Sequence, residues 1–461
     1  MATYYVSDTD GSDSNNGTSK TTALKTIPYA FQLAAGTGNT IEIIDSATYY
    51  ATGSSVTTML PGDDGGGQAW TNFTLKAGTD TSGNDVYPVL SGKRTNESGS
   101  IVTTNAISYG TGWTVEGLEI RSFDAQAALP SAAESTLIIK DCVVHHISSR
   151  NTGGSNDGCI EYSSTGVGDE TTNIVERCQF FEIGKYIIGA ACTEDVLIRN
   201  CLFALWGGTS GNNSAIRLHS SGTVVEHCTF SDYQGGTSIH ICDLDVGGGS
   251  AGTIRNCIFN KIGATVIADA FTINNNIFAN ITTATSGNAS SGKYLYSTRA
   301  SNVNDNIFTP NLSWGSGSSV EGVTVENLSA IKEAYILIEG SDGIGQASGS
   351  TVTDDIRNDG RSRASYAALH RPTSEGGDYR DADIGCYQHY RVYRSETNTP
   401  NSNIGNDFTI NDARNREYQY AMRLNDKEYE GPATSPISKT IKGPANLRRL
   451  GHSTPYKVNK G

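Results

Sequence analysis

One short pattern returns seven times in the middle of the chain. Each copy has an apolar residue, two polar residues, a Cys or Asn, a variable residue and a sixth position that is Phe in six copies. The copies are residues 139–144, 175–180, 198–203, 225–230, 254–259, 273–278 and 303–308. A segment this short cannot bury its apolar face alone, so each copy must stack on its neighbours. The pattern predicts a solenoid and argues against separate globular domains.

Composition specifies the kind of solenoid. The chain has 461 residues, 52 of them Gly, with 18% charged and 36% hydrophobic residues. Many small turn-forming residues between short apolar segments are typical of an all-β protein with many corners. Five of the nine cysteines occupy the same pattern position, so stacking predicts an interior ladder of free thiols. Disulfides between neighbouring coils are the alternative, and no Cys or His spacing is typical of a metal site.

Charge is distributed unevenly along the chain. The net charge is −14, but residues 391–461 hold 12 Lys and Arg against 7 Asp and Glu. The acidic remainder excludes nucleic acid as an expected partner. The last 31 residues contain six basic residues and no acidic one, which predicts an extended basic arm that docks on an acidic surface. The arm includes Lys439, Lys442, Arg448, Arg449 and Lys457.

The first 45 residues suggest a cap. Residues 4–6 and 40–44 are expected strands, and Pro28 favours a helix to about Ala35, ended by Gly36. A solenoid needs such a lid over its open end. The N-terminus has neither a basic start nor an apolar run, and no stretch reaches the ~18 apolar residues needed for a membrane span. We expect neither a secretory signal nor membrane insertion.

Several segments resemble a known family. They are Tyr4-Tyr5-Val6-Ser7, the Asp/Asn/Gly-rich loop after it, Thr26-Ile27-Pro28-Tyr29-Ala30, Asn39-Thr40-Ile41-Glu42-Ile43, Arg371-Pro372 and Asp383-Ile384-Gly385-Cys386-Tyr387. Together with the Cys/Asn-x-Phe copies they resemble right-handed parallel β-helix proteins, which include pectate-lyase-like enzymes and bacteriophage tailspikes. The resemblance implies an all-β, single-stranded right-handed parallel β-helix over residues 1–390. A small β-rich module (391–430) and the basic arm (431–461) would follow.

A second strand in each coil offers candidate site residues. Alternation along residues 158–162, 214–218 and 237–241 places Ile160, Ile216 and Ile239 inside. Side chains on the outer face could bind an anionic sugar or transfer a proton. An ordinary charge-paired sheet face is the alternative. The candidates are Glu161, Arg217 and His240, with His219, Asp243 and Asp245 nearby.

Weaker candidates complete the set. Hydrolysis of a polysaccharide needs two carboxylates, and Asp243, Asp245 and Asp269 could supply them, although Asp243–Gly249 also fits a plain turn. Trp206 could stack on a sugar ring or pack in the core. No polygalacturonase or lyase motif is found. Asp8, Asp10 and Asp13 could bind Ca²⁺, with a network of Asx turns as the alternative. We expect no other cofactor.

Two classes of function fit these features. The first is a structural virion protein of a bacteriophage, such as a tailspike, fibre or capsid-decorating protein. It would assemble in the host cytoplasm, present a carbohydrate- or host-facing surface, and anchor to other virion proteins through its arm. Resemblance to phage proteins implies a homotrimer. The alternative is an extracellular polysaccharide lyase, glycoside hydrolase or carbohydrate-binding adhesin. The missing catalytic motifs favour a protein that is not an enzyme.

Overall fold

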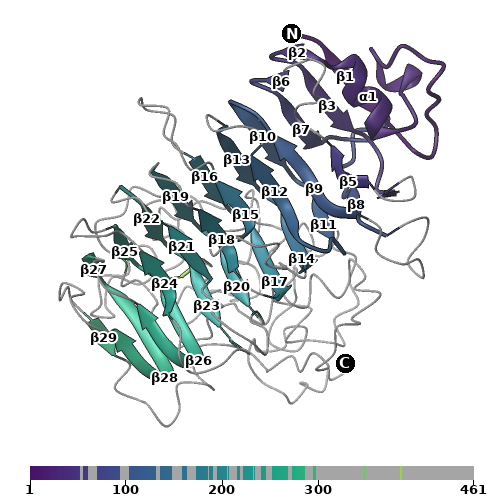
Figure 1. Cartoon of the computed structure of the whole chain (residues 1–461). Coiled ribbons are helices and arrows are strands. Elements are labelled where there is room, and N and C mark those ends of the chain that lie inside the picture. Colours follow the sequence, from purple (N-terminus) through teal and green to yellow (C-terminus); the bar gives the residue numbers. More distant parts are fainter. Residues whose placement is uncertain are drawn as a thin grey trace, which may run out of the picture. The chain divides into compact units, whose positions relative to one another are not determined.

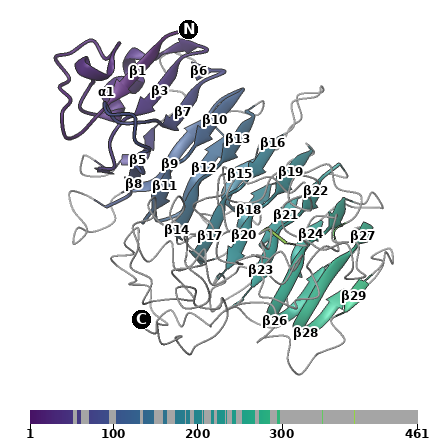
Figure 2. The same ribbon diagram turned by 180° about the vertical axis from the view of Figure 1, so that it is seen from behind.

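The chain folds as a right-handed parallel β-helix. The computed structural model describes most of residues 1–296, with gaps between strands, and Ala347, Gly385 and Cys386 beyond them. Every pairing between the named strands is parallel, and partners come from successive coils. Figure 1 shows the coils following one another from β1 to β29, and Figure 2 shows the same stack from behind. The predicted fold class is confirmed.

One strand of each coil belongs to a ten-stranded sheet, called sheet A. Its members are β1 (Thr3–Val6), β3 (Thr40–Ile43), β7 (Thr74–Ala77), β10 (Trp113–Glu116), β13 (Leu137–Lys140), β16 (Asn173–Glu176), β19 (Val196–Arg199), β22 (Val224–Glu226), β25 (Thr253–Arg255) and β27 (Thr272–Asn274).

Two further strands of each coil belong to a seventeen-stranded sheet, called sheet C. Its first column is β4 (Thr48–Tyr50), β8 (Val89–Ser91), β11 (Glu119–Arg121), β14 (Val143–Ile147), β17 (Gln179–Ile183), β20 (Leu202–Ala204), β23 (Thr229–Ser231), β26 (Ile258–Ile267), β28 (Asn276–Thr285) and β29 (Tyr294–Tyr296). Its second column is β5 (Val56–Leu60), β9 (Thr103–Tyr109), β12 (Gln126–Pro130), β15 (Gly158–Tyr162), β18 (Tyr186–Ala190), β21 (Ile216–Leu218) and β24 (His240–Leu244). The longer β26 and β28 run through both columns.

The repeated pattern is a strand, a corner and a second strand. The residue before each Cys has a positive φ, for example 54° at Asn200, and this one residue turns the chain from sheet A into sheet C. Gly, Asn and Asp tolerate this left-handed conformation best, which explains the frequent Asn. The corner residues are Gly117, Asp141, Arg177, Asn200, His227, Asn256 and Asn275. A second left-handed corner lies at Ser122, directly after β11, and at His146 and Glu182, one residue before the ends of β14 and β17.

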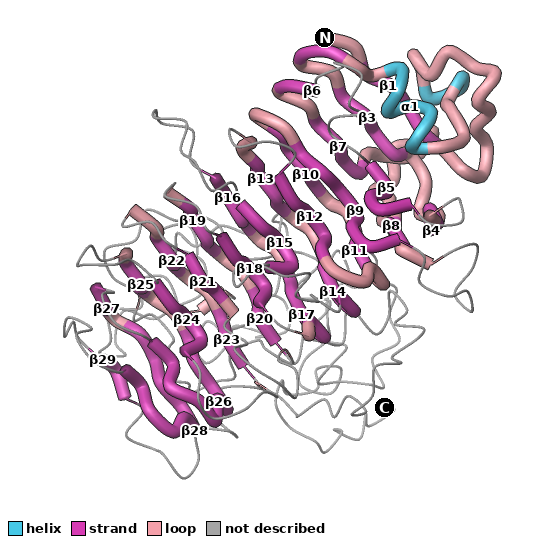
Figure 3. Tube along the Cα trace, in the orientation of Figure 1, coloured by secondary structure: helices cyan, strands magenta, loops and turns pink. Residues whose placement is uncertain are grey.

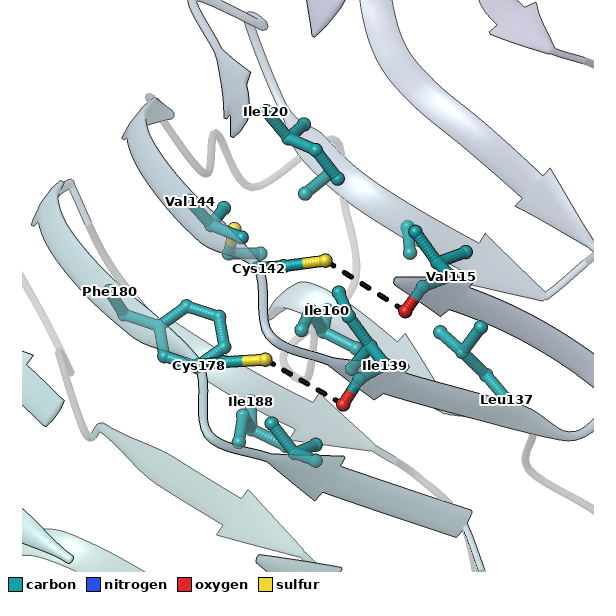
Figure 4. Packing of buried hydrophobic residues seen from close by; sticks show 14 of the residues in the cluster. Val115, Ile120, Leu137, Ile139, Cys142, Val144, Ile160, Cys178, Phe180 and Ile188 are labelled. Carbon is teal, nitrogen blue, oxygen red and sulfur yellow. Dashed lines mark hydrogen bonds between the residues drawn. The ribbon is translucent and has the colours of Figure 1, made fainter. Parts of the chain in front are cut away.

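Cysteines and phenylalanines form parallel ladders inside the coils. Each ladder thiol donates to a backbone oxygen one coil earlier, as Cys142 does to Val115 at 3.8 Å and Cys178 to Ile139 at 3.6 Å (Figure 4). The seven cysteines whose side chains the structure describes are free and buried, in agreement with the predicted thiol ladder. Rings stack face to face from coil to coil, with centroids 4.6–5.2 Å apart. The stack contains Phe180, Phe203, Phe230, Phe259 and Phe278.

Asparagine replaces cysteine where the ladder continues into β28. Asn276 Nδ2 donates to the Ile254 oxygen at 2.9 Å, the same contact that each thiol makes one coil earlier. Its Oδ1 accepts the amide of Cys257 at 2.8 Å. Asn and Cys are therefore interchangeable here because both present a donor to the preceding coil. The seventh copy, residues 303–308, lies outside the described residues.

The N-terminal helix covers the first coil, as predicted. Helix α1 (Ile27–Leu33) has Pro in its first turn, and the Thr26 hydroxyl accepts the Tyr29 amide at 3.4 Å. Phe31 stacks on Trp70 at 4.3 Å, and the Trp70 indole donates to the Phe31 oxygen. Besides α1, the remaining short elements are a 3-10 turn (Lys20–Thr22) and the paired β2 (Gly36–Thr37) and β6 (Trp70–Thr71). Figure 3 shows the helical segments grouped at this end.

Part of the motif at 383–387 returns to the coils. The Gly385 amide donates to the Asn256 oxygen at 2.8 Å, and the Cys386 amide donates to the Thr229 hydroxyl at 3.1 Å. Both residues lie against the outer face of sheet C, where Gly385 approaches Ile258. The expected module at 391–430 and the arm at 431–461 lie outside the described residues.

Candidate functional site

The structure places two of the three residues predicted for the outer column, Glu161 and Arg217, in one column. The parallel register aligns Glu161 with Gly189, Gly189 with Arg217 and Arg217 with Asp243. Ile160, Ile188 and Ile216 line the interior beside this column. Glu161 and Arg217 therefore share one outer column, two coils apart, as the sequence predicted.

The predicted place of His240 is wrong. Cys242, and not Ile239, continues the column of Ile160 and Ile216, and Asp243 takes the position beside Arg217. His240 is aligned with Thr265 instead. The observed register of β24 therefore differs from the predicted one by three residues. The register of β24 could not be read from its sequence, since both Ile239 and Cys242 are acceptable interior residues.

Glu161 and Arg217 each have partners of their own. Gln126 Nε2 donates to Glu161 Oε2, and the Tyr109 hydroxyl donates to the Glu161 backbone oxygen at 2.7 Å. Arg217 Nη1 donates to the Tyr186 hydroxyl at 3.1 Å, and its guanidinium carbon lies 5.6 Å from the Tyr186 ring centroid. These contacts are made to neutral groups, and they hold Glu161 and Arg217 on the sheet face.

The remaining predicted residues fall in three groups. Trp206 is fully buried and packs against Phe230 and Tyr233, so it belongs to the core and cannot stack on a sugar. Asp8, Asp10 and Asp13 do not gather into a metal site. Asp13 accepts instead from the Lys25 and Thr26 amides and the Thr26 hydroxyl, ahead of α1. The residues that lie outside the described part of the chain are His219, Asp245, Asp269, Lys439, Lys442, Arg448, Arg449 and Lys457.

A different cluster of titratable side chains lies on the first column of sheet C. Arg121 and His145 are register partners, and both contact the Glu119 carboxylate, at 2.8 Å from Arg121 Nη1 and 3.0 Å from His145 Nε2. The His145 ring stacks on Phe181 with centroids 4.7 Å apart, and its Nδ1 meets Nδ1 of His146. We call Glu119, Arg121, His145, His146 and Glu182 the corner cluster.

Glu182 joins this cluster through the second corner. His145 and Ile147 are aligned with Phe181 and Ile183, so His146 and Glu182 occupy stacked left-handed corners on strands about 4.8 Å apart. The Glu182 side chain is half-buried, and among the described residues it has no hydrogen-bond or ion-pair partner. His146 Nε2 is buried and likewise accepts no hydrogen bond there. Among the described residues, the Glu182 carboxyl and His146 Nε2 are therefore the polar groups of the corners that lack a hydrogen-bond partner.

Burial perturbs both corner groups. Desolvation raises the pKa of Glu182 from 4.5 to about 7. Desolvation, together with the charges of His145, Arg121 and Lys93, lowers the pKa of His146 to about 3. At neutral pH, His146 is therefore uncharged, and Glu182 exchanges its proton close to the ambient pH. A carboxyl group with such a pKa can act as a general acid or base.

The sequence contained a signal for this cluster. Aligning Leu118 with Cys142 and Cys178 places Arg121, His145 and Phe181 in one column. In the sequence, His145 and His146 directly follow the repeat copy at residues 139–144, and in the structure His146 has a left-handed backbone conformation. The raised pKa of Glu182 has no sequence signal, because it depends on burial.

Stacked coils of three parallel strands under one capping helix define a right-handed parallel β-helix protein, with the corner cluster as its candidate site. No protein-family model matches the chain. No curated protein matches its sequence. In the described part of the chain, no helix is long and apolar enough to span a membrane.

Some solved structures are similar to this chain. One is a pectate lyase, at 14% identity and a TM-score of 0.41, covering 85% of this chain and 97% of that chain. A rhamnogalacturonan lyase aligns at 16% identity and a TM-score of 0.32, covering 61% and 74%. A pectin methylesterase from Aspergillus niger aligns at 13% identity and a TM-score of 0.32, covering 68% and 91%. The fold assignment itself rests on the strand pairings of this chain.

Proposed function

We propose that this β-helix protein binds acidic polysaccharide at the corner cluster and cleaves it by proton transfer through Glu182. The observation that supports the proposal is a half-buried carboxyl group without a partner among the described residues, whose pKa of about 7 suits a general base. The buried Arg121 and Lys93 act electrostatically on His146, the corner residue one coil before Glu182, and this positive charge favours a negatively charged ligand at the cluster.

The chemistry that fits best is β-elimination from a uronic acid. The ionised Glu182 would remove the proton from the carbon beside the sugar carboxylate, and the electrons of that C–H bond would form a carbon–carbon double bond. The glycosidic C–O bond would break, and its oxygen would leave with the bonding electrons and take up a proton from water. Negative charge then develops on the sugar carboxylate, and the positive charge of the buried Lys93 and Arg121 would favour it electrostatically. Hydrolysis would need a second carboxylate at about 5–9.5 Å, and the Glu119 carboxylate is already held by Arg121 and His145.

The test is incubation of the full chain with polygalacturonate, alginate and hyaluronan. Elimination products are detected by the ultraviolet absorbance of their unsaturated ends, and binding is measured by calorimetry. We expect the rate to rise with pH through about 7, since the base must be ionised. Glu182→Gln should abolish cleavage and retain binding.

Glu116→Gln is the matched control, because Glu116 is a partly exposed carboxylate on sheet A, away from the cluster. This variant should cleave like the parent chain. Unchanged cleavage by Glu182→Gln would remove Glu182 from the mechanism. Absence of binding to every acidic polysaccharide in the panel would overturn the proposal as a whole.

A second candidate is a bacteriophage virion protein whose carbohydrate-facing surface is the β-helix and whose anchor is the basic arm. The six basic and no acidic residues of 431–461 favour this candidate. The two functions are compatible, because a virion protein can also cleave the glycan that it recognises. Deleting 431–461 should abolish incorporation into particles and leave the β-sheet circular dichroism unchanged. Normal incorporation of the truncated chain would refute the anchoring role.

A further inference from the structure

The outer face of sheet A carries a ladder of strictly alternating charge. The last outward position of eight successive strands reads Glu42, Lys76, Glu116, Lys140, Glu176, Arg199, Glu226 and Arg255, each in register with the next. Within the chain, each acid pairs with the base of the following coil, at 3.0, 3.2, 2.8 and 2.8 Å. The resulting four ion pairs all point the same way along the stack.

A second column on the same face is apolar in its middle. Thr occupies it in β3, β7 and β10 and again in β25 and β27, but four adjacent coils between them present larger side chains. These are Ile138, Ile174, Leu197 and Val224, which are in register and partly exposed. Other coils fold with Thr at this position, so stacking of the coils does not by itself explain the four apolar residues.

When the order of the coils is reversed in a second copy, the residues of both columns are complementary to those of the first copy. Consider a two-fold axis parallel to the strands, lying between β16 and β19. It places Ile174 opposite Leu197 of a second copy, and Ile138 opposite Val224. The same axis places Glu176 opposite Arg199 and Glu116 opposite Arg255, which are all partly exposed, and Lys140 opposite Glu226, which is itself buried. Within the six coils from β10 to β25, apolar residues then meet apolar residues and each acid meets a base, with the ion pairs of one copy reversed against those of the other.

We propose that the outer face of sheet A binds a second copy of this chain, with the two β-helix axes antiparallel. If the two β-helix axes were parallel instead, the two-fold axis would place the charged column of one copy against the apolar column of the other. That contact is unfavourable. The proposed dimer differs from the trimer that resemblance to phage proteins implies. Six coils at about 4.8 Å each give a contact strip about 29 Å long. A strip of this size belongs to the small class of interfaces, so association should occur at micromolar or higher concentration.

The experiment measures the mass of the full chain by analytical ultracentrifugation over a dilution series. The parent chain should pass from monomer to dimer. The Ile174→Thr/Leu197→Thr variant should stay monomeric at least tenfold higher in concentration, with unchanged circular dichroism, since Thr fits this column in neighbouring coils. Tyr87→Thr removes an exposed apolar side chain elsewhere and should associate like the parent chain.

Cross-linking tests the register directly. Chains carrying Ile174→Cys are mixed with chains carrying Leu197→Cys and oxidised, and the mixed dimer should form in excess of either homodimer. Ile138→Cys should cross-link to Val224→Cys and not to itself. A parent chain that remains monomeric, sediments as a trimer, or cross-links through Ile138→Cys to itself would overturn the proposal. Equal association by the Thr variant would overturn it as well.

Discussion

Ring stacking inside the coils predicts a graded loss of local stability. Phe203 lies between Phe180 and Phe230, with centroid distances of 5.2 and 4.6 Å. Among the described residues, Phe180 has a stacked ring on one side only, that of Phe203, because its register partner in the preceding coil is Val144. Both side chains are fully buried on neighbouring strands of the same column. Replacing each by Leu therefore removes similar apolar volume but a different number of ring pairs.

The expected loss of stability follows from the number of stacked ring pairs that each substitution removes. An aromatic pair contributes about 0.5–1.5 kcal/mol beyond burial. Phe203→Leu loses two pairs, or about 1–3 kcal/mol, and Phe180→Leu loses one, or about 0.5–1.5 kcal/mol. The change in apolar volume is common to both and cancels in the comparison. The difference is one pair, which corresponds to about a 2- to 12-fold difference in local opening.

Native-state hydrogen exchange with mass spectrometry is the suitable assay, because a solenoid opens locally and its global unfolding is not two-state. Peptides over Val196–Ala204 report on Phe203, and peptides over Asn173–Ile183 report on Phe180. We expect the larger rise in exchange for Phe203→Leu, with β1 and β3 unaffected. Equal rises in the two variants, or a uniform rise along all coils, would refute the stacking argument.

Three further predictions concern the corners, the cluster and the thiols. Gly117→Val should destabilise the fold by about 1–3 kcal/mol, since φ is 73° and a Cβ would lie 3.0 Å from the Ala77 Cβ; Gly117→Asn should cost less, and equal melting temperatures would contradict the corner argument. The raised pKa of Glu182 means that the folded chain holds a proton that the unfolded chain releases, so stability falls as pH rises from 4.5 to about 7. Glu182→Gln should lack this component, and urea titrations of both chains across that range test it; parallel curves would refute the shift. Burial raises the pKa of Cys142, Cys178, Cys201 and Cys228, so a thiol reagent should label them only after unfolding, and labelling of the native chain would contradict the interior ladder.

The candidate site shows how far sequence reasoning reaches. The column of Glu161 and Arg217 was predicted correctly, because alternation within a strand needs only the strand itself. His240 was misplaced, since the register between coils depends on loops whose lengths vary. The corner cluster escaped notice because its members come from three coils between Glu119 and Glu182, and no segment contains them all.

Repetition in the sequence was sufficient to determine the solenoid and the interior thiol ladder, because a coil with an unburied apolar face is not stable alone and every coil must satisfy the same local pattern. The capping helix followed from Pro28 and Gly36, which mark its beginning and its end. Only the tertiary structure decided which residues of different coils face one another. The alternating charges of sheet A, the raised pKa of Glu182 and the position of Asp243 beside Arg217 all depend on register and burial. These quantities exist only after stacking, when strands about 4.8 Å apart bring distant residues together.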